Sequence, residues 1–109
     1  MKFIIGARQS GKTTKILKIA EKKDLIIVTA NHAGCEYLKR TIKDKELKVK
    51  DPITWNKFFS GRTRDIKCKG YIIEDLECCL SGMGVKVATM STDEKMVEIE
   101  FMKNWKLFP

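Results

Sequence analysis

Short apolar runs alternate with amphipathic stretches along this chain of 109 residues. Runs rich in Ile and Val at 2–5, 25–29, 71–73 and 85–90 are typical of buried strands. At 97–101 the apolar residues alternate with glutamates, which predicts a fifth strand with one solvent-exposed face, as at the edge of a sheet.

Stretches in which apolar residues have helical spacing lie between these strands. At 12–23 the apolar residues fall on one face and the lysines on the other, which predicts an amphipathic helix. Asn31 is positioned to cap a second helix that runs to about Lys43. Its expected inward-facing residues are Tyr37, Leu38 and either Thr41 or Ile42.

Weaker signals lie in the second half of the chain. A short strand is expected at 47–49, ended by Asp51-Pro52, then a helix-like stretch at 53–60 and a short helix around 76–80. Strands that alternate with helices predict an α/β fold, with a mainly parallel sheet in a single domain spanning 1–109.

Composition indicates an ordinary globular protein, with 43% hydrophobic and 33% charged residues. No apolar run approaches the ~18 residues that a membrane span needs. The apolar stretch at 2–5 is too short for a signal peptide, so we expect a cytoplasmic protein without a membrane partner.

Charge is concentrated in the first half of the chain. The net charge is +8; residues 1–50 carry 13 basic and 5 acidic side chains, whereas 51–109 carry nine of each. Such a balance attracts phosphate-rich partners. The alternative interpretation is that the lysines only keep the outer helix faces soluble.

The four cysteines are Cys35, Cys68, Cys78 and Cys79. None has C-x-x-C spacing and His32 is the only histidine, so a zinc site is not expected. We expect reduced thiols that pack as small apolar side chains.

One segment, residues 6–13, matches a phosphate-binding motif at every fixed position. Gly6-Ala7-Arg8-Gln9-Ser10-Gly11-Lys12-Thr13 has the spacing G-x-x-x-x-G-K-[ST], between a strand and a helix. The glycines let successive N–H groups face one anion, and the helix start adds its positive dipole end. Lys12 is expected to neutralise the β- and γ-phosphates, and the Thr13 hydroxyl to bind Mg²⁺. The expected phosphate-binding residues are Gly6, Ala7, Arg8, Gln9, Ser10, Gly11, Lys12, Thr13 and Thr14.

Two adjacent carboxylates follow the predicted strand at 71–73. A P-loop NTPase needs an acidic residue at the end of a neighbouring apolar strand, to hold magnesium and to activate water. Glu74 is therefore the candidate magnesium ligand beside Thr13. Asp75 is the candidate for positioning the attacking water.

In these motifs the chain resembles the Walker-type P-loop ATPases. The loop is similar to those of helicase-like ATPases and of phage terminase-like motors, and the resemblance covers roughly residues 2–92. It implies ATP as the ligand, with GTP left open as the alternative, and a sheet order of 5-1-4-3-2, counting the five main strands along the chain. It also implies that Arg8 acts on the γ-phosphate and that Thr89 senses it. The family's second motor lobe and nuclease domain are missing from the sequence, which resembles a reduced core suited to a compact phage genome, acting in the host cytoplasm.

The order of the two carboxylates departs from the family pattern. Asp-Glu is usual there, whereas this chain has Glu74-Asp75. Glu74 is one methylene longer near the metal, and Asp75 is one methylene shorter towards the water. A misplacement of ~1 Å can cost ~100-fold in rate, so we expect binding to survive better than fast hydrolysis.

The stretch 55–70 mixes aromatic and basic residues. Exposed rings would stack on nucleic-acid bases while the cations meet phosphates. The alternative is that the rings belong to the core. The rings are those of Trp55, Phe58 and Phe59, and the cations are Lys57, Arg62 and Arg64. In a homo-oligomer the two arginines are also candidates for reaching a neighbouring subunit's nucleotide.

These observations predict a Mg²⁺-dependent ATPase that acts with DNA or RNA. Two alternatives remain open. One is a nucleotide-binding adaptor or switch with little hydrolysis, favoured by the Glu-Asp order and the small size. The other is a nucleoside or nucleotide kinase, which would need a lid that the sequence does not show.

Overall fold

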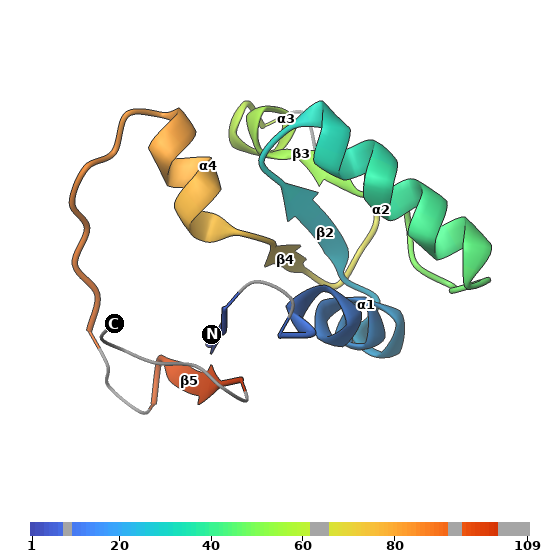
Figure 1. Ribbon diagram of the computed structural model, residues 1–109, viewed down its shortest axis with the longest axis horizontal. Helices are drawn as coiled ribbons and strands as arrows, with labels where there is room; N and C mark the ends of the chain where they lie inside the picture. The colour runs from blue at the N-terminus through green and yellow to red at the C-terminus, as the bar shows by residue number, and fades with distance from the viewer. Residues whose placement is uncertain (8–9, 62–65, 92–94, 103–109) are drawn as a thin grey trace. The chain divides into compact units, whose positions relative to one another are not determined.

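The structure is a computed structural model that describes residues 1–7, 10–61, 66–91 and 95–102. The chain divides into two compact units, one of Met1–Lys15 with Val87–Pro109 and one of Ile16–Lys86. The elements in chain order are β1 (Lys2–Ile5), α1 (Lys12–Lys23), β2 (Ile26–Thr29), α2 (His32–Asp44), β3 (Ile53–Thr54), α3 (Trp55–Phe59), β4 (Tyr71–Ile73), α4 (Leu76–Gly82) and β5 (Glu98–Phe101) (Figure 1).

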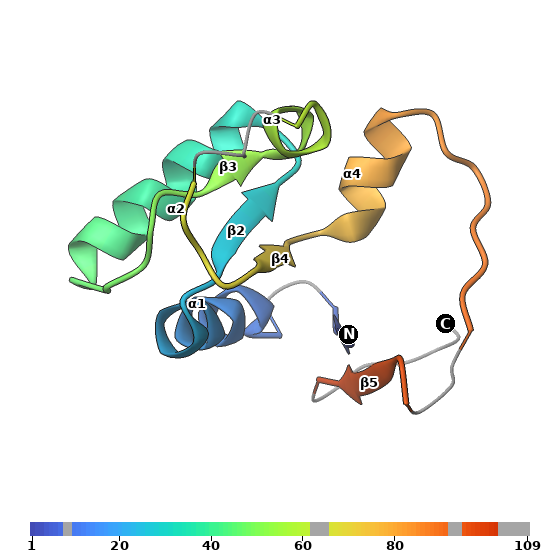
Figure 2. The ribbon, with the colours of Figure 1, turned by 180° about the vertical axis from the view of Figure 1, so that it is seen from behind.

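The larger unit is built on a three-stranded parallel sheet in the order β3-β2-β4. Val28 of β2 lies opposite Ile53 of β3 and Ile73 of β4. All four residues of β2 are buried, which is typical of a central parallel strand. Helix α2 provides the crossover from β2 to β3 and runs alongside both strands (Figure 2).

The core of this unit follows the predicted periodicity. Ile16, Leu17 and Ala20 are the buried residues of α1, as a helix with one apolar face requires. Around β2, partly buried hydrophobic side chains pack against a buried cluster of Ile26, Val28 and Ile53. The partly buried side chains are Trp55, Phe58, Ile66, Cys68 and Tyr71.

Helix α2 begins as the sequence predicts. The Asn31 side chain accepts a hydrogen bond from the Gly34 backbone N–H at 2.9 Å, which confirms the cap. The prediction for Tyr37 is wrong, because that side chain is 58% exposed. The buried positions are Cys35, Leu38 and Ile42, which share one stripe, and Tyr37 is turned about 100° away from Leu38.

The end of α2 holds a non-glycine residue in the left-handed region. The Leu47 N–H donates to the Ile42 carbonyl at 3.0 Å and the Glu46 N–H to the Lys43 carbonyl at 3.1 Å. This is a Schellman motif, in which the residue at the Glu46 position is usually glycine. Glu46 adopts φ 52°, which crowds its Cβ.

Replacing Glu46 by glycine is therefore expected to raise the free energy of unfolding by about 0.5–1 kcal/mol. Urea denaturation followed by circular dichroism measures the change. Lys45→Gly is the control, since Lys45 at φ −92° gains nothing from glycine and should be neutral or destabilised. Lower stability for Glu46→Gly would contradict the prediction.

The smaller unit contains a two-stranded parallel sheet of β1 and β5, with Phe3 opposite Ile99. The Glu100 carboxylate forms ion pairs with Lys2, at 2.9 Å, and with Lys15. Glu100 is therefore half-buried and Phe101 is 50% exposed, so the strict alternation expected at 97–101 fails at the end of β5.

The α/β class with parallel strands is confirmed, but the single five-stranded sheet of order 5-1-4-3-2 is not observed. The described residues form two small sheets instead. The strand predicted at 85–90 is wrong as well, because 85–91 has no regular secondary structure (Figure 1). A strand needs a partner for its backbone groups, and residue preferences do not supply one.

The region before β3 also differs from the prediction. Residues 47–49 form no strand, and the short strand β3 begins instead directly after the buried Pro52. None of the helices in the described ranges has the length and apolar character that crossing a bilayer requires.

Candidate functional site

The phosphate-binding motif has the predicted strand–loop–helix setting. The loop leaves β1 after Ile5 and enters α1 at Lys12. Gly11 adopts φ 88°, a conformation that favours glycine, immediately before the helix begins. The Gly11 carbonyl accepts from the Lys15 N–H at 3.0 Å, so the first helical turn is closed at the loop.

The Lys12 side chain folds back over its own loop. Its ammonium donates to the Gly6 carbonyl at 2.7 Å and to the Ala7 carbonyl at 2.8 Å. An ammonium group has three donors, so these two acceptors hold the charge at the loop while leaving donor capacity for an anion. Lys12 is thus placed against the backbone that the motif assigns to phosphate.

Two further residues define the inside of the loop. The Ser10 Oγ is buried and has no hydrogen-bond partner among the described residues, which is uncommon for a hydroxyl group. Met102 follows β5, and its N–H donates to the Ile5 carbonyl at 2.7 Å. A Cβ added to Gly6 would stand 2.5 Å from Ser10 Oγ and 2.8 Å from Met102 Cβ, so both side chains lie against the glycine.

Sequence reasoning missed Met102. The available signal was the parallel pairing of 97–101 with 2–5, which brings the ends of the two strands to the same level. Without a known register, that pairing does not say which residue reaches the loop.

The two carboxylates stand at the carboxyl end of β4, as predicted. The Glu74 N–H donates to the Val28 carbonyl at 2.8 Å, and its side chain is half-buried. Asp75 is exposed and adopts φ 53° and ψ 58°, with no hydrogen bond from its side chain to the start of α4. The loop belongs to the smaller unit and the carboxylates to the larger one.

The other predicted residues lie either outside the described residues or at exposed positions. Arg8 and Gln9 in the loop and Arg62 and Arg64 in the basic segment lie outside the described residues. Thr89 lies in the exposed, irregular stretch 85–91, and Thr14 is exposed on α1.

The aromatic residues of 55–70 divide between the two predicted roles. Phe58 packs against the core and meets Tyr71 edge-on at 4.9 Å between ring centroids. Phe59 is 65% exposed and stacks on Trp55 at 5.7 Å. The core interpretation therefore holds for Phe58 and for the half-buried Trp55, which both pack against the core cluster, and Phe59 presents a ring to solvent.

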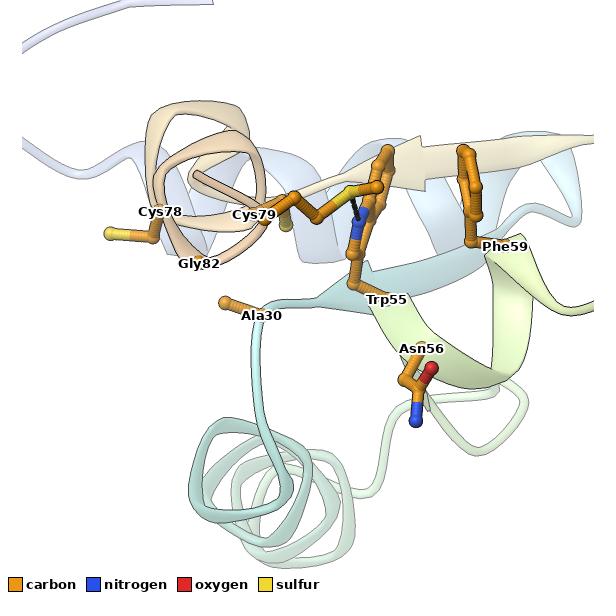
Figure 3. Close-up of a pocket in the computed structure, with 8 residues that line it drawn as sticks. Ala30, Trp55, Asn56, Phe59, Cys78, Cys79 and Gly82 are labelled. Atoms are coloured by element: carbon orange, nitrogen blue, oxygen red, sulfur yellow. Dashed lines mark hydrogen bonds between the residues drawn. The ribbon is translucent and has the colours of Figure 1, made fainter. Parts of the chain in front are cut away.

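A hollow of about 260 Å³ lies beside the exposed ring (Figure 3). Ala30, which follows β2, and Trp55, which follows β3, both line it, so it opens at the carboxyl ends of parallel strands. Cys79 of α4 and Met83, which follows that helix, also line it, and the Met83 sulfur accepts a hydrogen bond from Trp55 Nε1 at 2.8 Å. No sequence motif indicates this hollow, since its lining comes from three separate segments.

The cysteines divide by burial. Cys35 and Cys79 are buried, Cys68 is half-buried and Cys78 is exposed, all as free thiols. Burial raises the pKa of the Cys79 thiol, and the neighbouring Cys78 raises it further. Burial likewise raises the pKa of Cys35. Across the described ranges, no group of three or more His, Cys, Asp or Glu side chains is arranged to hold a metal ion.

The raised thiol pKa values predict a loss of stability at alkaline pH. In the unfolded chain these thiols ionise near pH 9.0, whereas the folded chain keeps their protons to a higher pH. Above about pH 9 the unfolded state therefore binds fewer protons, and the free energy of unfolding falls as pH rises. Urea titrations at pH 8, 9 and 10 under reducing conditions measure the slope. A Cys79→Ala variant should show a shallower slope, and equal slopes would contradict the prediction.

Comparison with known proteins found no matching family model, curated protein or solved structure. The functional assignment therefore rests on the chain's own residues.

Proposed function

We propose that the chain is a P-loop NTPase that binds Mg-ATP, hydrolyses it and acts with nucleic acid. The observation that carries the proposal is the Lys12 ammonium, held on the Gly6 and Ala7 carbonyls of a glycine loop between a strand and a helix. The buried Ser10 hydroxyl, which has no hydrogen-bond partner within the part of the chain that the structure describes, supports it, because a bound phosphate would supply one.

Each residue has a distinct role in this proposal. The N–H groups of the loop and Lys12 bind the phosphates, and Lys12 offsets the charge that develops during transfer. Arg8 and Thr89 are proposed to meet the γ-phosphate.

Magnesium fits the oxygen donors that the chain offers. Mg²⁺ is typically held by one or two protein oxygens together with phosphates and water. The Thr13 hydroxyl and the Glu74 carboxylate are donors of this kind. Bound there, the ion would neutralise phosphate charge, while Asp75 positions the attacking water.

The switch alternative is favoured by the backbone at Asp75. The left-handed region tolerates Asp better than Glu, so the short carboxylate suits this position even though it reaches less far towards a water. An exposed Asp75 is consistent with slow turnover.

Exchanging the two carboxylates separates the alternatives. The double variant Glu74→Asp/Asp75→Glu restores the family order and is expected to raise turnover about tenfold, because both carboxylates regain their usual reach. Glu46 shows that the chain accepts Glu at φ 52°. Steady-state phosphate release measures the effect, and unchanged turnover would favour the switch.

The direct test is Mg-ATP turnover by the purified protein, alone and with single- or double-stranded DNA. The proposal predicts turnover that EDTA abolishes and that DNA stimulates, with the Lys12→Ala variant as the control for contaminating activity. Tight ATP binding without turnover in any condition would overturn the ATPase and leave the switch. No binding of ATP would overturn both.

A further inference from the structure

The hollow beside α3 has a size that suits one ring rather than a whole ligand. At about 260 Å³ it falls below the ~300–1,000 Å³ of pockets that enclose drug-sized molecules. Figure 3 shows the rings of Trp55 and Phe59 standing side by side at its rim. A flat group can therefore enter while the rest of its molecule stays in solvent.

The exposed ring is the feature that needs an explanation. Phe59 is 65% exposed although its neighbour Phe58 packs into the core from the same short helix. Trp55 stacks on Phe59 with an interplanar angle of 29°, so the two rings present a preformed aromatic platform. A ring held in this way loses little conformational freedom when a flat ligand stacks on it.

The lining of the hollow is neutral. Asn56 is among the residues that line it, and Figure 3 shows its amide pointing away from the two rings. None of the lining residues is acidic. Lys57 is exposed on the same short helix as Phe59.

We propose that this hollow binds an unpaired base of single-stranded nucleic acid, stacked on Phe59 and Trp55, with Lys57 against the phosphate backbone. This inference rests on the nucleic-acid partner in the proposed function and assigns it a site. The carboxyl ends of β2 and β3 position that site, which needs no bound ATP.

The test uses the full chain without ATP. A Trp105→Phe substitution leaves Trp55 as the sole tryptophan, because the sequence has two. Titration with oligothymidylate is expected to quench Trp55 fluorescence, and anisotropy of the labelled oligomer gives the affinity in the unsubstituted chain. RNA of matched length should bind by the same stacking, whereas blunt duplex DNA and thymidine monophosphate should bind much more weakly.

Phe59→Ala is expected to weaken oligomer binding roughly 5- to 150-fold, the range for loss of one stacked base. Phe59→Tyr should retain binding. Tyr37→Ala is the matched control, since Tyr37 is also a largely exposed aromatic residue but does not line the hollow. Circular dichroism establishes that each variant is folded.

Three results would overturn the inference: equal affinity of Phe59→Ala and the parent chain, no quenching of Trp55, or equal binding of duplex and single strands. The Lys12→Ala variant should bind the oligomer as the parent does. A failed ATPase with intact oligomer binding would therefore overturn the proposed function alone.

Discussion

The Lys12→Ala variant is expected to lose Mg-ATP turnover by roughly 100- to 1,000-fold, the cost of removing one donor that faces developing charge. The structure provides the reason, because the ammonium is already held at the loop by the Gly6 and Ala7 carbonyls. ATP affinity should fall by about tenfold or more, since hydrogen bonds to charged groups contribute roughly 1.5–3 kcal/mol. Phosphate release and equilibrium binding of a fluorescent ATP analogue measure the two effects.

Lys18→Ala is the matched control for this variant. Lys18 is exposed on the same helix, so its replacement removes one positive charge without touching the loop. Its turnover and affinity should stay close to those of the parent chain. If both lysine variants retain the parent's activity, Lys12 does not bind phosphate and the proposed site is wrong.

The parts of the fold that the sequence predicts well depend on local signals. Asn31 caps α2 through a contact three residues away, and the apolar stripe of α1 follows from helical spacing alone. The strand β2 is predictable because a continuous run of β-branched residues leaves few alternatives.

Pairing between strands could not be predicted in the same way. Val85 and Val87 have strand preferences as strong as those of β2, yet 85–91 has no regular structure. Whether such a run becomes a strand depends on a partner that is distant in sequence. The prediction for Tyr37 is wrong for a different reason. The buried stripe of α2 consists of Cys35, Leu38 and Ile42, so the neighbouring position of Tyr37 faces solvent.

The candidate site shows the same difference between local sequence signals and contacts between distant segments. The loop, Glu74 and Asp75 are short motifs, and the sequence indicates each of them directly. Their surroundings are assembled from distant segments: Met102 reaches the loop through the register of β5 with β1. Asp75 adopts the left-handed region, in which Asp is found more often than Glu, so its backbone is compatible with the Glu-Asp order.

Gly6→Ala is expected to abolish measurable ATP binding while leaving the larger unit folded. The added Cβ would stand 2.5 Å from Ser10 Oγ and 2.8 Å from Met102 Cβ, so the loop or β5 has to move. Overpacking of this kind costs about 1–3 kcal/mol, and a loop displaced by ~1 Å no longer directs its N–H groups at one phosphate. Binding of the ATP analogue, with circular dichroism on the same samples, measures the effect. Gly82→Ala is the matched control, because a Cβ at Gly82 meets nothing within 4 Å. The ATP affinity of this variant should equal that of the parent chain. Parental ATP affinity in Gly6→Ala would show that the close packing around Gly6 does not shape a phosphate site.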